Sequence, residues 1–471
     1  MPPTAEQLAR RNLTNKPLGR TLLRLAVPVA ADSAIRSLYN LADAFWLGRW
    51  SKEGLAAVGV SMPFFFITIA FGMGFGTAGT SLVSQLTGAN RHEEAERAAA
   101  QTLLFMFTLA LCFSVPLAIW APQLFDLVQV PENAQAEAIS YIRIMCAGLP
   151  LIAFIIAYGS VLRGLGDTTT VLVIGAVNNI LNVIIDPFLI FGWAGLPAMG
   201  AAGAALAGVI SLCTGTVAAI ICMKRQRAGL ALHFRDFKPD WDLLKRIARI
   251  GFPAALNNSS ASIGFASLQV MINALGTAVI GAFTIGLRVI FFFNIPGHAV
   301  AAAAAPVVGQ ALGARRPKLA RRSIWMGSLL VAVVMFLPLV FLIWQGGLVA
   351  SAFTDNPAVQ EEARLFFLAM PAASYFFSVL MVLTAAFFGS GHTTPAMVVG
   401  ILRSFLLRLP LAYLFAFVLG WESLGIYIAW IVGNVISALV TLYLFRRGGW
   451  QKATIHTRTP EPPPPEGGSS G

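Results

Sequence analysis

Three carboxylates interrupt long apolar stretches of the chain: Asp32, Asp43 and Asp186. A carboxylate surrounded by apolar groups is costly to bury as an anion, so it is expected to bind a proton or a partner of opposite charge. We expect the other acids, out of 21 Asp and Glu in the chain, to lie outside these stretches. The chemistry that the three residues predict is cation binding.

The three acids belong to two polar stripes. The first stripe, at i, i+4, i+7 and i+11, consists of Asp32, Arg36, Tyr39 and Asp43. The second stripe, at i, i+3 and i+7 and directly before a proline, consists of Asn179, Asn182 and Asp186. At about 3.6 residues per turn, each stripe lies on one face of a helix. If the two faces meet, they form a cation-coupling cluster of Asp43, Asp186, Asn182 and Tyr39.

Such a cluster can be loaded by a proton or by sodium. Burial favours the protonated form of a carboxyl group, and a second carboxylate nearby separates the two titrations. Sodium would use the same oxygens as hard ligands, at Asp43, Asn182 and Asp186. The residues leave both ions open, and we expect no cofactor other than the coupling ion.

Asp32 and Arg36 admit two interpretations. They can line a substrate cavity together with Asn179 and Arg288, or they can neutralise each other as a structural pair on one helix. Asp43 and Asp186 have no basic residue at helical spacing, which favours a functional role. In the second half of the chain, Arg288 could face Asp43 across a cavity. Arg408 lies close enough to the predicted end of its segment for its guanidinium to reach the membrane interface.

Twelve apolar segments must position these residues. The chain is 57% apolar and 11% charged, whereas soluble domains are about one quarter charged. Each segment is long enough to cross a hydrocarbon core of roughly 30 Å. The segments begin near Thr21, Val58, Ala98, Ile139, Thr170, Gly200, Ile247, Ile280, Ser323, Leu365, Ala396 and Gly425. The predicted fold class is therefore an all-α polytopic membrane protein with 12 transmembrane helices.

The distribution of Lys and Arg predicts the orientation. Residues 224–249 and 315–322 are strongly basic, whereas residues 126–137 and 355–362 carry only acids. Short loops rich in Lys and Arg stay in the cytoplasm, so both termini are predicted to be cytoplasmic. This distribution also accounts for the net charge of +12, and we expect no nucleic-acid partner.

The sequence repeats itself after 225 residues. This shift aligns Pro28 with Pro253, Gln85 with Gln310, and the stretch 164–169 with 389–394. Each copy holds six spans, so the two copies enter the membrane in the same direction and form parallel bundles. Such transporters bind substrate between their bundles and rock one bundle against the other. The acids Asp32, Asp43 and Asp186 align with Asn257, Leu268 and Leu411, which places the predicted coupling site in the first copy.

The repeat gives the domain organisation. We predict a cytoplasmic N-terminus at 1–20, an N-terminal six-helix lobe at 21–223, a basic cytoplasmic linker at 224–246, a C-terminal six-helix lobe at 247–446 and a disordered cytoplasmic tail at 447–471. No cleavable signal precedes the first span, which follows several arginines.

Several stretches resemble the multidrug and toxic compound extrusion (MATE) family. They are Leu86-Thr-Gly-Ala-Asn90, Gly309-Gln-Ala-Leu-Gly-Ala314, Leu162-Arg-Gly-Leu-Gly-Asp-Thr168 and Asn182-Val-Ile-Ile-Asp-Pro-Phe-Leu-Ile-Phe-Gly192. The resemblance runs from about Leu18 to Arg447. It implies a monomeric inner-membrane antiporter that exports small organic, often cationic and lipophilic compounds in exchange for protons or sodium.

Within the family, the chain resembles the DNA-damage-inducible, DinF-type branch. That resemblance implies that Asp43 acts with Asp186 and Asn182, that Tyr39 lines the cavity and that Pro28 lets the first span bend. The branch can supply a span-six threonine to the cation site, but residues 200–208 here contain no hydroxyl. This departure favours protons over sodium.

Two other functions are alternatives to such an exporter. A lipid-linked precursor flippase of the same wider superfamily would also have parallel bundles, and Arg36, Arg288 and Arg403 could hold its phosphates. A membrane enzyme would need a nucleophile or metal set near one interface, and the five histidines are scattered along the chain. We therefore predict a transporter and not an enzyme.

Overall fold

The structure is a computed structural model that describes residues 13–50, 52–127, 132–225 and 232–455. These residues form twelve long helical segments and no β-strand. The segments are α2 (Leu18–Trp50), α3 (Lys52–Gly88), α4 (His92–Ile119), α6 (Glu132–Gly164), α7 (Thr168–Phe191), α8 (Gly200–Lys224), α9 (Trp241–Asn273), α10 (Thr277–Gly313), α11 (Pro317–Ser351), α12 (Pro357–Ser390), the segment 394–418 and α15 (Glu422–Arg447). Nine of the twelve are long and apolar enough, over their described residues, to cross a membrane by length and composition alone.

The segment 394–418 is not a regular α-helix. It consists of α13 (Thr394–Ile401), a π-helical stretch η3 (Leu402–Arg408), α14 (Leu409–Tyr413) and a second π-helical stretch η4 (Leu414–Val418). In a π-helix each N–H bonds to the carbonyl five residues back, which widens the turn and changes the register of every residue that follows. The short elements of the described chain are α5 (Ala121–Leu127), η1 (Trp193–Gly195), η2 (Phe234–Phe237) and η5 (Gly449–Gln451).

The repeat recurs in the turns between helices. Gly166 and Gly391 stand at matching positions after α6 and α12, and both have left-handed backbone, with φ of 80° and 78°. Asn90 and Arg315 match in the same way after α3 and α10, with φ of 59° and 57°. Left-handed backbone is uncommon for residues other than glycine, so two matched instances indicate one turn geometry used twice.

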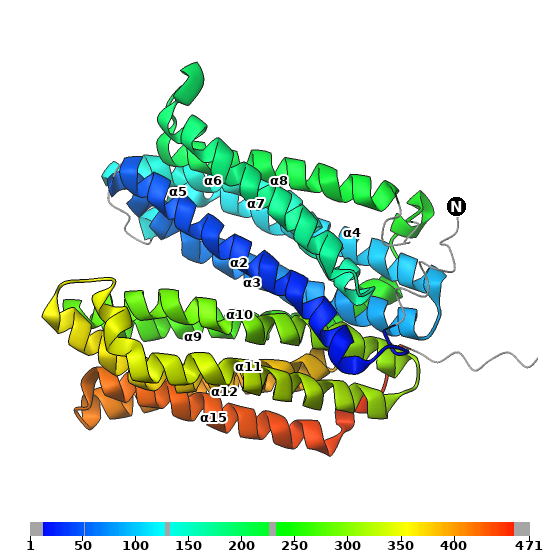
Figure 1. Cartoon of the computed structure of the whole chain (residues 1–471). Helices are drawn as coiled ribbons and strands as arrows, with labels where there is room; N and C mark the ends of the chain where they lie inside the picture. The colour runs from blue at the N-terminus through cyan, green and yellow to red at the C-terminus, as the bar shows by residue number, and fades with distance from the viewer. Residues whose placement is uncertain (1–12, 51, 128–131, 226–231, 456–471) are drawn as a thin grey trace, which may run out of the picture.

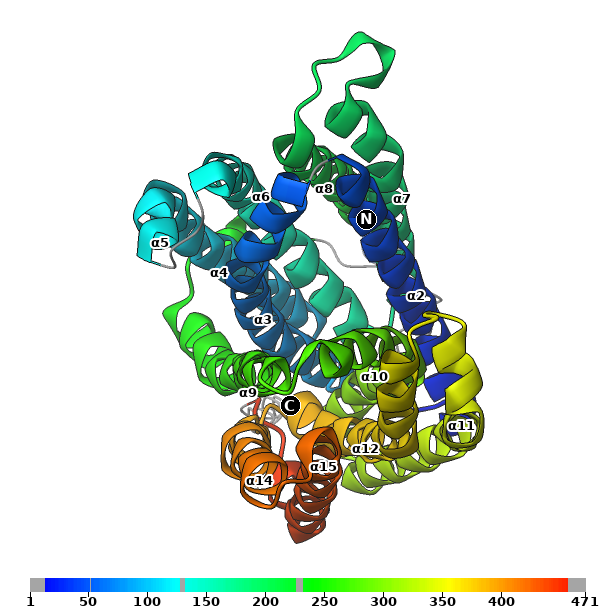
Figure 2. The same ribbon diagram turned by 90° about the vertical axis from the view of Figure 1, so that its left-hand side faces the viewer.

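Helices α2 to α8 form one group and α9 to α15 a second group beside it, and the long axes run roughly parallel (Figure 1). The ends of α3, α6, α8, α10 and α12 and the starts of α2, α4, α7, α9, α11 and α13 share one end of the molecule. We call this the basic end, because Arg91, Lys224, Arg315 and Arg316 lie there. The other end is called the opposite end, and it faces the viewer in Figure 2.

The first helix of each group begins in the other group. Leu22 and Leu25 of α2 are buried in a cluster with residues of α10, α11 and α12, and α2 then crosses to α7 and α8 (Figure 2). Ile247 and Ile250 of α9 are buried in a cluster with residues of α3, α4 and α6. Each helix therefore has one part in each lobe, and Pro28 and Pro253 lie just after the exchanged parts.

The two groups meet closely at the basic end, where α3 and α10 pack together. Gly88 lies against the backbone of Gln310, and Gly313 lies against the backbone of Gln85, so neither glycine has room for a Cβ atom. The side chain of each glutamine also reaches across: Gln85 donates to the carbonyl of Gly389 (3.3 Å), and Gln310 donates to that of Gly164 (3.2 Å). These contacts hold the lobes together on this side.

The chain ends complete the contacts of these glutamines. The N–H of Leu13 donates to Oε1 of Gln310 (3.0 Å), and the N–H of Thr454 donates to Oε1 of Gln85 (2.8 Å). The predicted disordered tail is therefore wrong for residues 447–455, because Trp450 is 1% exposed and Thr454 is held by the other lobe. The rest of the predicted tail, 456–471, and most of the predicted N-terminus lie outside the described residues.

The predicted linker is also partly helical. Helix α9 begins at Trp241, capped by the side chain of Asp240, which accepts from the N–H groups of Asp242 and Leu243. A capping carboxylate satisfies backbone donors that have no partner within the helix. Hydropathy alone does not detect this polar first turn. The predicted start of the C-terminal lobe at 247 is therefore too late in the chain.

Candidate functional site

The acids of the first lobe lie near the opposite end. Asp43 is on α2 seven residues before its end at Trp50, and Asp186 is on α7 five residues before its end at Phe191. Helix α2 packs along α7, so the two predicted stripes face each other. The left-handed Gly192 terminates α7 directly after the sequence that carries Asp186 and Pro187.

Asp186 is the most buried of these acids, with no exposed surface. The Asn182 side chain, with its amide nitrogen toward Asp186, donates to Oδ2 at 3.2 Å and accepts from the N–H of Gly208 at 3.0 Å. The other carboxylate oxygen, Oδ1, is buried and has no hydrogen-bond partner. A buried acceptor without a partner is costly, so this oxygen is a ready acceptor for a proton or a metal cation.

Asp43 and Tyr39 complete the cluster from α2. Tyr39 interacts electrostatically with both Asp43 and Asp186, and the two carboxyl groups interact with each other. The structure therefore brings together the four residues predicted from the stripes: Tyr39, Asp43, Asn182 and Asp186. Within the described residues, none of the ion pairs involves Asp43 or Asp186.

Tyr141 is a member of the cluster that the sequence did not reveal. It comes from α6, is 7% exposed and interacts electrostatically with Asp43 and Asp186. It packs with Leu47 and Ile190 in a small apolar cluster around the acids. A lone tyrosine near the start of an apolar segment carries no periodic signal, so only the packing of α6 against α7 and α8 identifies it.

Asp32 and Arg36 form a separate polar layer closer to the basic end. They make an ion pair at 3.1 Å, and Arg163 of α6 lies within electrostatic range of both. Asp32 also sits against Gly175 of α7, and its Oδ1 atom is buried without a partner. Asp32 and Arg36 therefore form the ion pair that the structural interpretation requires. Oδ1 of Asp32 can still accept a hydrogen bond or bind a cation.

The other predicted residues are Asn179 and Arg288, expected to line the cavity, and Pro28, expected to let α2 bend. Asn179 is 7% exposed and accepts from the neighbouring Asn178 at 3.2 Å. Arg288 of α10 is exposed, and among the described contacts it has no bond to the acids of the first lobe. Pro28 lies within α2, where this helix leaves the cluster of the second lobe.

The interface position predicted for Arg408 is wrong. Arg408 is 5% exposed and donates to Oδ1 of Asn434 at 3.2 Å. It ends the η3 stretch in the middle of the segment 394–418, and ten further residues follow it before the segment ends. The helix continues from Arg408 through Leu409 and Pro410 to Val418, so this arginine lies within the segment and not at its end.

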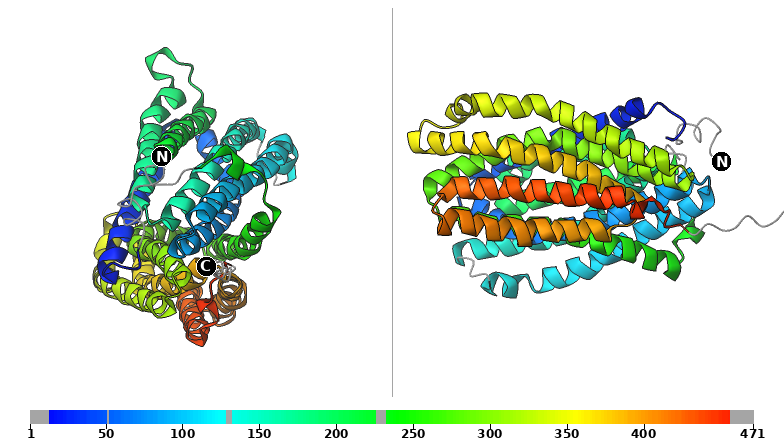
Figure 3. Two further views of the ribbon diagram at one scale, coloured as in Figure 1. Left: turned by 90° about the vertical axis from the view of Figure 1, so that its right-hand side faces the viewer. Right: turned by 90° about the horizontal axis from the view of Figure 1, so that it is seen from below.

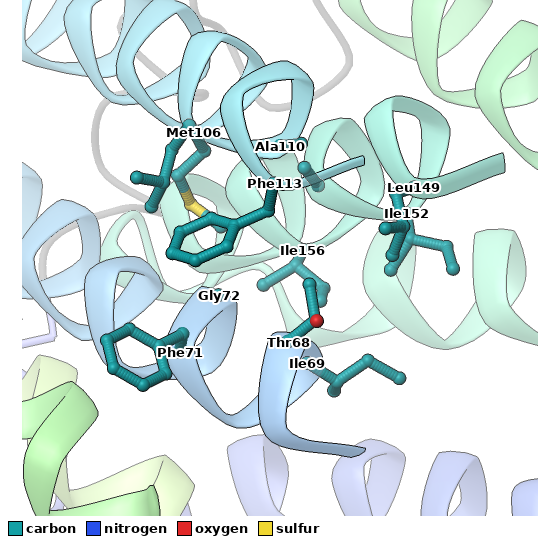
Figure 4. A pocket seen from close by; sticks show the side chains of 12 residues that line it. Thr68, Ile69, Phe71, Gly72, Met106, Ala110, Phe113, Leu149, Ile152 and Ile156 are labelled. Atoms are coloured by element: carbon teal, nitrogen blue, oxygen red, sulfur yellow. The ribbon is translucent and has the colours of Figure 1, made fainter. Parts of the chain in front are cut away.

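A small pocket in the first lobe differs in character from the acid cluster. It lies between α3, α4 and α6, and apart from the Thr68 hydroxyl its lining side chains are apolar, including Phe71, Met106, Phe113 and Ile156 (Figure 4). It contains no charged residue. Within the described residues, no group of three or more His, Cys, Asp and Glu side chains is placed to hold a metal ion.

Comparison with known proteins agrees with the fold and with the repeat. The family model described as MatE matches residues 28–188 and again residues 253–414, two segments whose starts are 225 residues apart. The chain is 26% identical over 93% of its length to a probable multidrug resistance protein NorM of Thermotoga maritima, of which it covers 94%. It is also 26% identical to a protein named FAD transporter of Shewanella oneidensis, over 93% of this chain and 96% of that protein.

A solved structure described as MATE in the bent conformation is similar over 94% of this chain and 97% of its own, with a TM-score of 0.87 and 25% identity. The twelve-helix fold, the double match and the similarity over nearly the whole chain lead to one assignment. The protein belongs to the MatE family of multidrug and toxic compound extrusion transporters, which are multi-pass membrane proteins.

Proposed function

We propose that this transporter exports small organic, often cationic and lipophilic compounds in exchange for a cation, and that protons are favoured over sodium as that cation. The coupling cluster consists of Asp43, Asp186, Asn182 and Tyr39, with Tyr141 as a further member. Asp186 is the residue that carries the proposal. Its carboxylate is fully buried, one of its oxygens has no partner, and a second acid lies within electrostatic range.

The arrangement of the lobes supports alternating access. The basic end is held by the paired contacts of Gln85 and Gln310, whereas the acid cluster lies toward the opposite end. In the proposed orientation the basic end and both termini are cytoplasmic, because Lys and Arg concentrate there. The structure then corresponds to a state closed to the cytoplasm, in the inner membrane and as a monomer. Binding of the coupling cation at Asp186 would neutralise its charge and thereby change the free energy of packing between α2 and α7.

The relatives support export of organic compounds and give no support to the lipid-linked precursor flippase. One relative is named a probable multidrug resistance protein and another an FAD transporter. These names also leave room for substrates that are not cationic. We therefore propose a drug exporter whose substrate range extends beyond lipophilic cations.

The test is transport by purified protein in liposomes, under a pH gradient and a sodium gradient imposed separately. An organic cation such as ethidium serves as the substrate, and Asp43→Asn and Asp186→Asn are compared with the wild-type protein. We expect the pH gradient to drive wild-type transport and both variants to lose at least tenfold in rate, which corresponds to about 1.4 kcal/mol. Asp355→Asn is the matched control, because Asp355 is exposed and lies in the connection between α11 and α12.

Wild-type rates in both cluster variants would refute the coupling site. Transport driven only by the sodium gradient would refute the preference for protons. If neither gradient moved any organic compound, antiport itself would be refuted.

A further inference from the structure

The second lobe buries two arginines without an acidic partner. Arg403 and Arg408 are 7% and 5% exposed, and both lie on η3, five residues apart and so about one π-helical turn from each other. The chain has no Asp or Glu between Leu243 and Thr354. The other acids of the described part of this lobe lie in connections or in the first two turns of a helix; they are Asp242, Asp355, Glu361, Glu362 and Glu422.

Aromatic rings cover the faces of both guanidinium groups. Cζ of Arg403 lies 4.8 Å from the centre of the Phe377 ring, and Cζ of Arg408 lies 4.3 Å from that of Trp430. Asn434 accepts one hydrogen bond from Arg408, and Nε of each arginine is buried without a partner. A guanidinium held against a ring keeps its N–H donors in its own plane, where they match the geometry of an oxyanion.

Further polar groups without partners lie on the elements that carry and contact the arginines. The hydroxyl of Ser404, the residue after Arg403, is buried without a partner, and Ser404 packs against Gly264 of α9. On α15, a stripe at helical spacing runs through Tyr427, Trp430, Asn434 and Ser437, and the hydroxyl groups of Tyr427 and Ser437 are also buried without partners. Segment 394–418 and α15 lie side by side (Figure 3), and Trp430 and Asn434 of this stripe contact Arg408.

The position matches that of the acid cluster in the first lobe. Gly208 of α8 packs against Asn182, and its counterpart Gly433 of α15 packs against Arg408. A constant shift of 225 residues would place Leu407 opposite Gly433, and the π-helical stretch moves Arg408 into that position instead. The second lobe therefore presents a fixed positive charge where the first presents the amide partner of its acid.

Burying an ion without a counter-ion is unfavourable. Cation–π contacts offset only part of this cost. Two such ions on one helical turn also repel each other. An oxyanion would neutralise them and use the free N–H and O–H donors together.

We propose that Arg403 and Arg408, with Ser404 and Asn434, form a binding site for the carboxylate or phosphate group of an organic compound that the transporter carries. The site uses other residues than the proposed cation-coupling cluster, although the role of its ligand as a substrate rests on the transport function proposed above. Binding can be measured without any gradient, so failure of the site and failure of coupled transport are distinguishable.

The experiment measures binding of benzoate and phenyl phosphate to the full-length protein in detergent, by calorimetry and by the shift in Tm. We expect both compounds to bind and to raise the Tm of the wild-type protein. Arg403→Gln and Arg408→Gln should weaken binding at least tenfold and remove the Tm shift, whereas Asp186→Asn should bind as the wild type does. Arg364→Gln is the matched control, because Arg364 is an exposed arginine of the same lobe, paired with Glu361.

A measurement with inorganic phosphate distinguishes a site for an organic anion from a site for a free inorganic ion. We expect it to bind at least tenfold more weakly than phenyl phosphate. If inorganic phosphate bound with the same dependence on Arg403 and the organic anions did not, the site would hold a free ion and the proposal would be overturned. Equal affinities in the wild-type and Arg403→Gln proteins would also overturn it. Should Arg408→Gln fail to fold, Arg403→Gln and the wild-type Tm shift still decide the matter.

Discussion

In the first lobe, α7 carries Asn182 and Asp186 as buried residues, and Tyr141 of α6 lies beside them. In the second lobe, the residues 225 positions later are Leu407, Leu411 and Phe366. The turns and the close glycine contacts recur in both lobes, but the polar interior does not. Residues that shape the backbone are thus repeated, whereas the charged residues differ: among the described residues, the first lobe buries Asp186 without a basic partner, and the second lobe buries Arg403 and Arg408 without an acidic one.

Moving the acid between lobes should have the largest effect. In the double variant Asp186→Leu with Ala412→Asp, the new acid stands at the position that matches Asp186 after the one-residue shift of the π-helical stretch. It would lie one turn from Arg408 in place of Asn182 and would lack a counterpart of Tyr141. We expect gradient-driven transport in liposomes to fall by about a hundredfold, similar to the loss of a positioned proton-transfer group in an enzyme. Transport rates near those of the wild type would show that the lobes are interchangeable. They would contradict the functional difference inferred between the two lobes.

Matching substitutions in the two lobes should have equal effects on the closed basic end. Gly88→Ala and Gly313→Ala each place a Cβ atom against the backbone of the other lobe, and overpacking of this kind costs about 1–3 kcal/mol. We expect both variants to favour opening of this end. The measurement is the rate of maleimide labelling at Thr87→Cys, a position that is 5% exposed, in a protein whose four native cysteines are replaced.

Gly48→Ala is the control for this pair, because nothing lies within 4 Å of a Cβ atom added there. A large effect of only one of the two glycine variants would contradict the symmetry of the basic end.

The buried arginine of the second lobe can be compared with an apolar side chain at the same position. Arg408→Leu leaves Oδ1 of Asn434 without its donor, which should cost about 1–3 kcal/mol. Adding Asn434→Val, which copies Val209 of the first lobe, should recover part of that stability. Thermal unfolding of the single and double variants in detergent measures this coupling. Strictly additive effects would show that the two side chains do not support each other.

The smallest effect should come from Tyr141→Phe, which copies Phe366 of the second lobe. The variant lacks the hydroxyl that interacts electrostatically with Asp43 and Asp186. We expect coupled transport to slow by about two- to tenfold, which corresponds to about 0.5–1.5 kcal/mol. Tyr443→Phe is the matched control, because Tyr443 is 65% exposed on α15. An unchanged rate in Tyr141→Phe would remove this residue from the cluster.

Much of the fold could be predicted from the sequence, because apolar length, helical period and the 225-residue repeat are local or regular signals. The twelve helices were confirmed, whereas the coupling role of Asp43 and Asp186 stays a prediction. The π-helical stretch at Leu402–Arg408 has no periodic signature, so the burial of Arg408 could not be predicted. The position of Tyr141 beside the acids and the structure of residues 447–455 result from contacts between segments far apart in the sequence. Hydropathy contains no information about such contacts.

The bonds from Leu13 to Gln310 and from Thr454 to Gln85 attach each chain end to the lobe at the far end of the sequence. The two ends are thereby anchored on either side of the contact between α3 and α10. Fluorophores placed at Thr14 and Ala453 would move apart whenever that contact separates. The distance between labels at these two positions therefore reports whether the basic end is open. The timing of single transport cycles can thus be recorded without labelling any transmembrane helix.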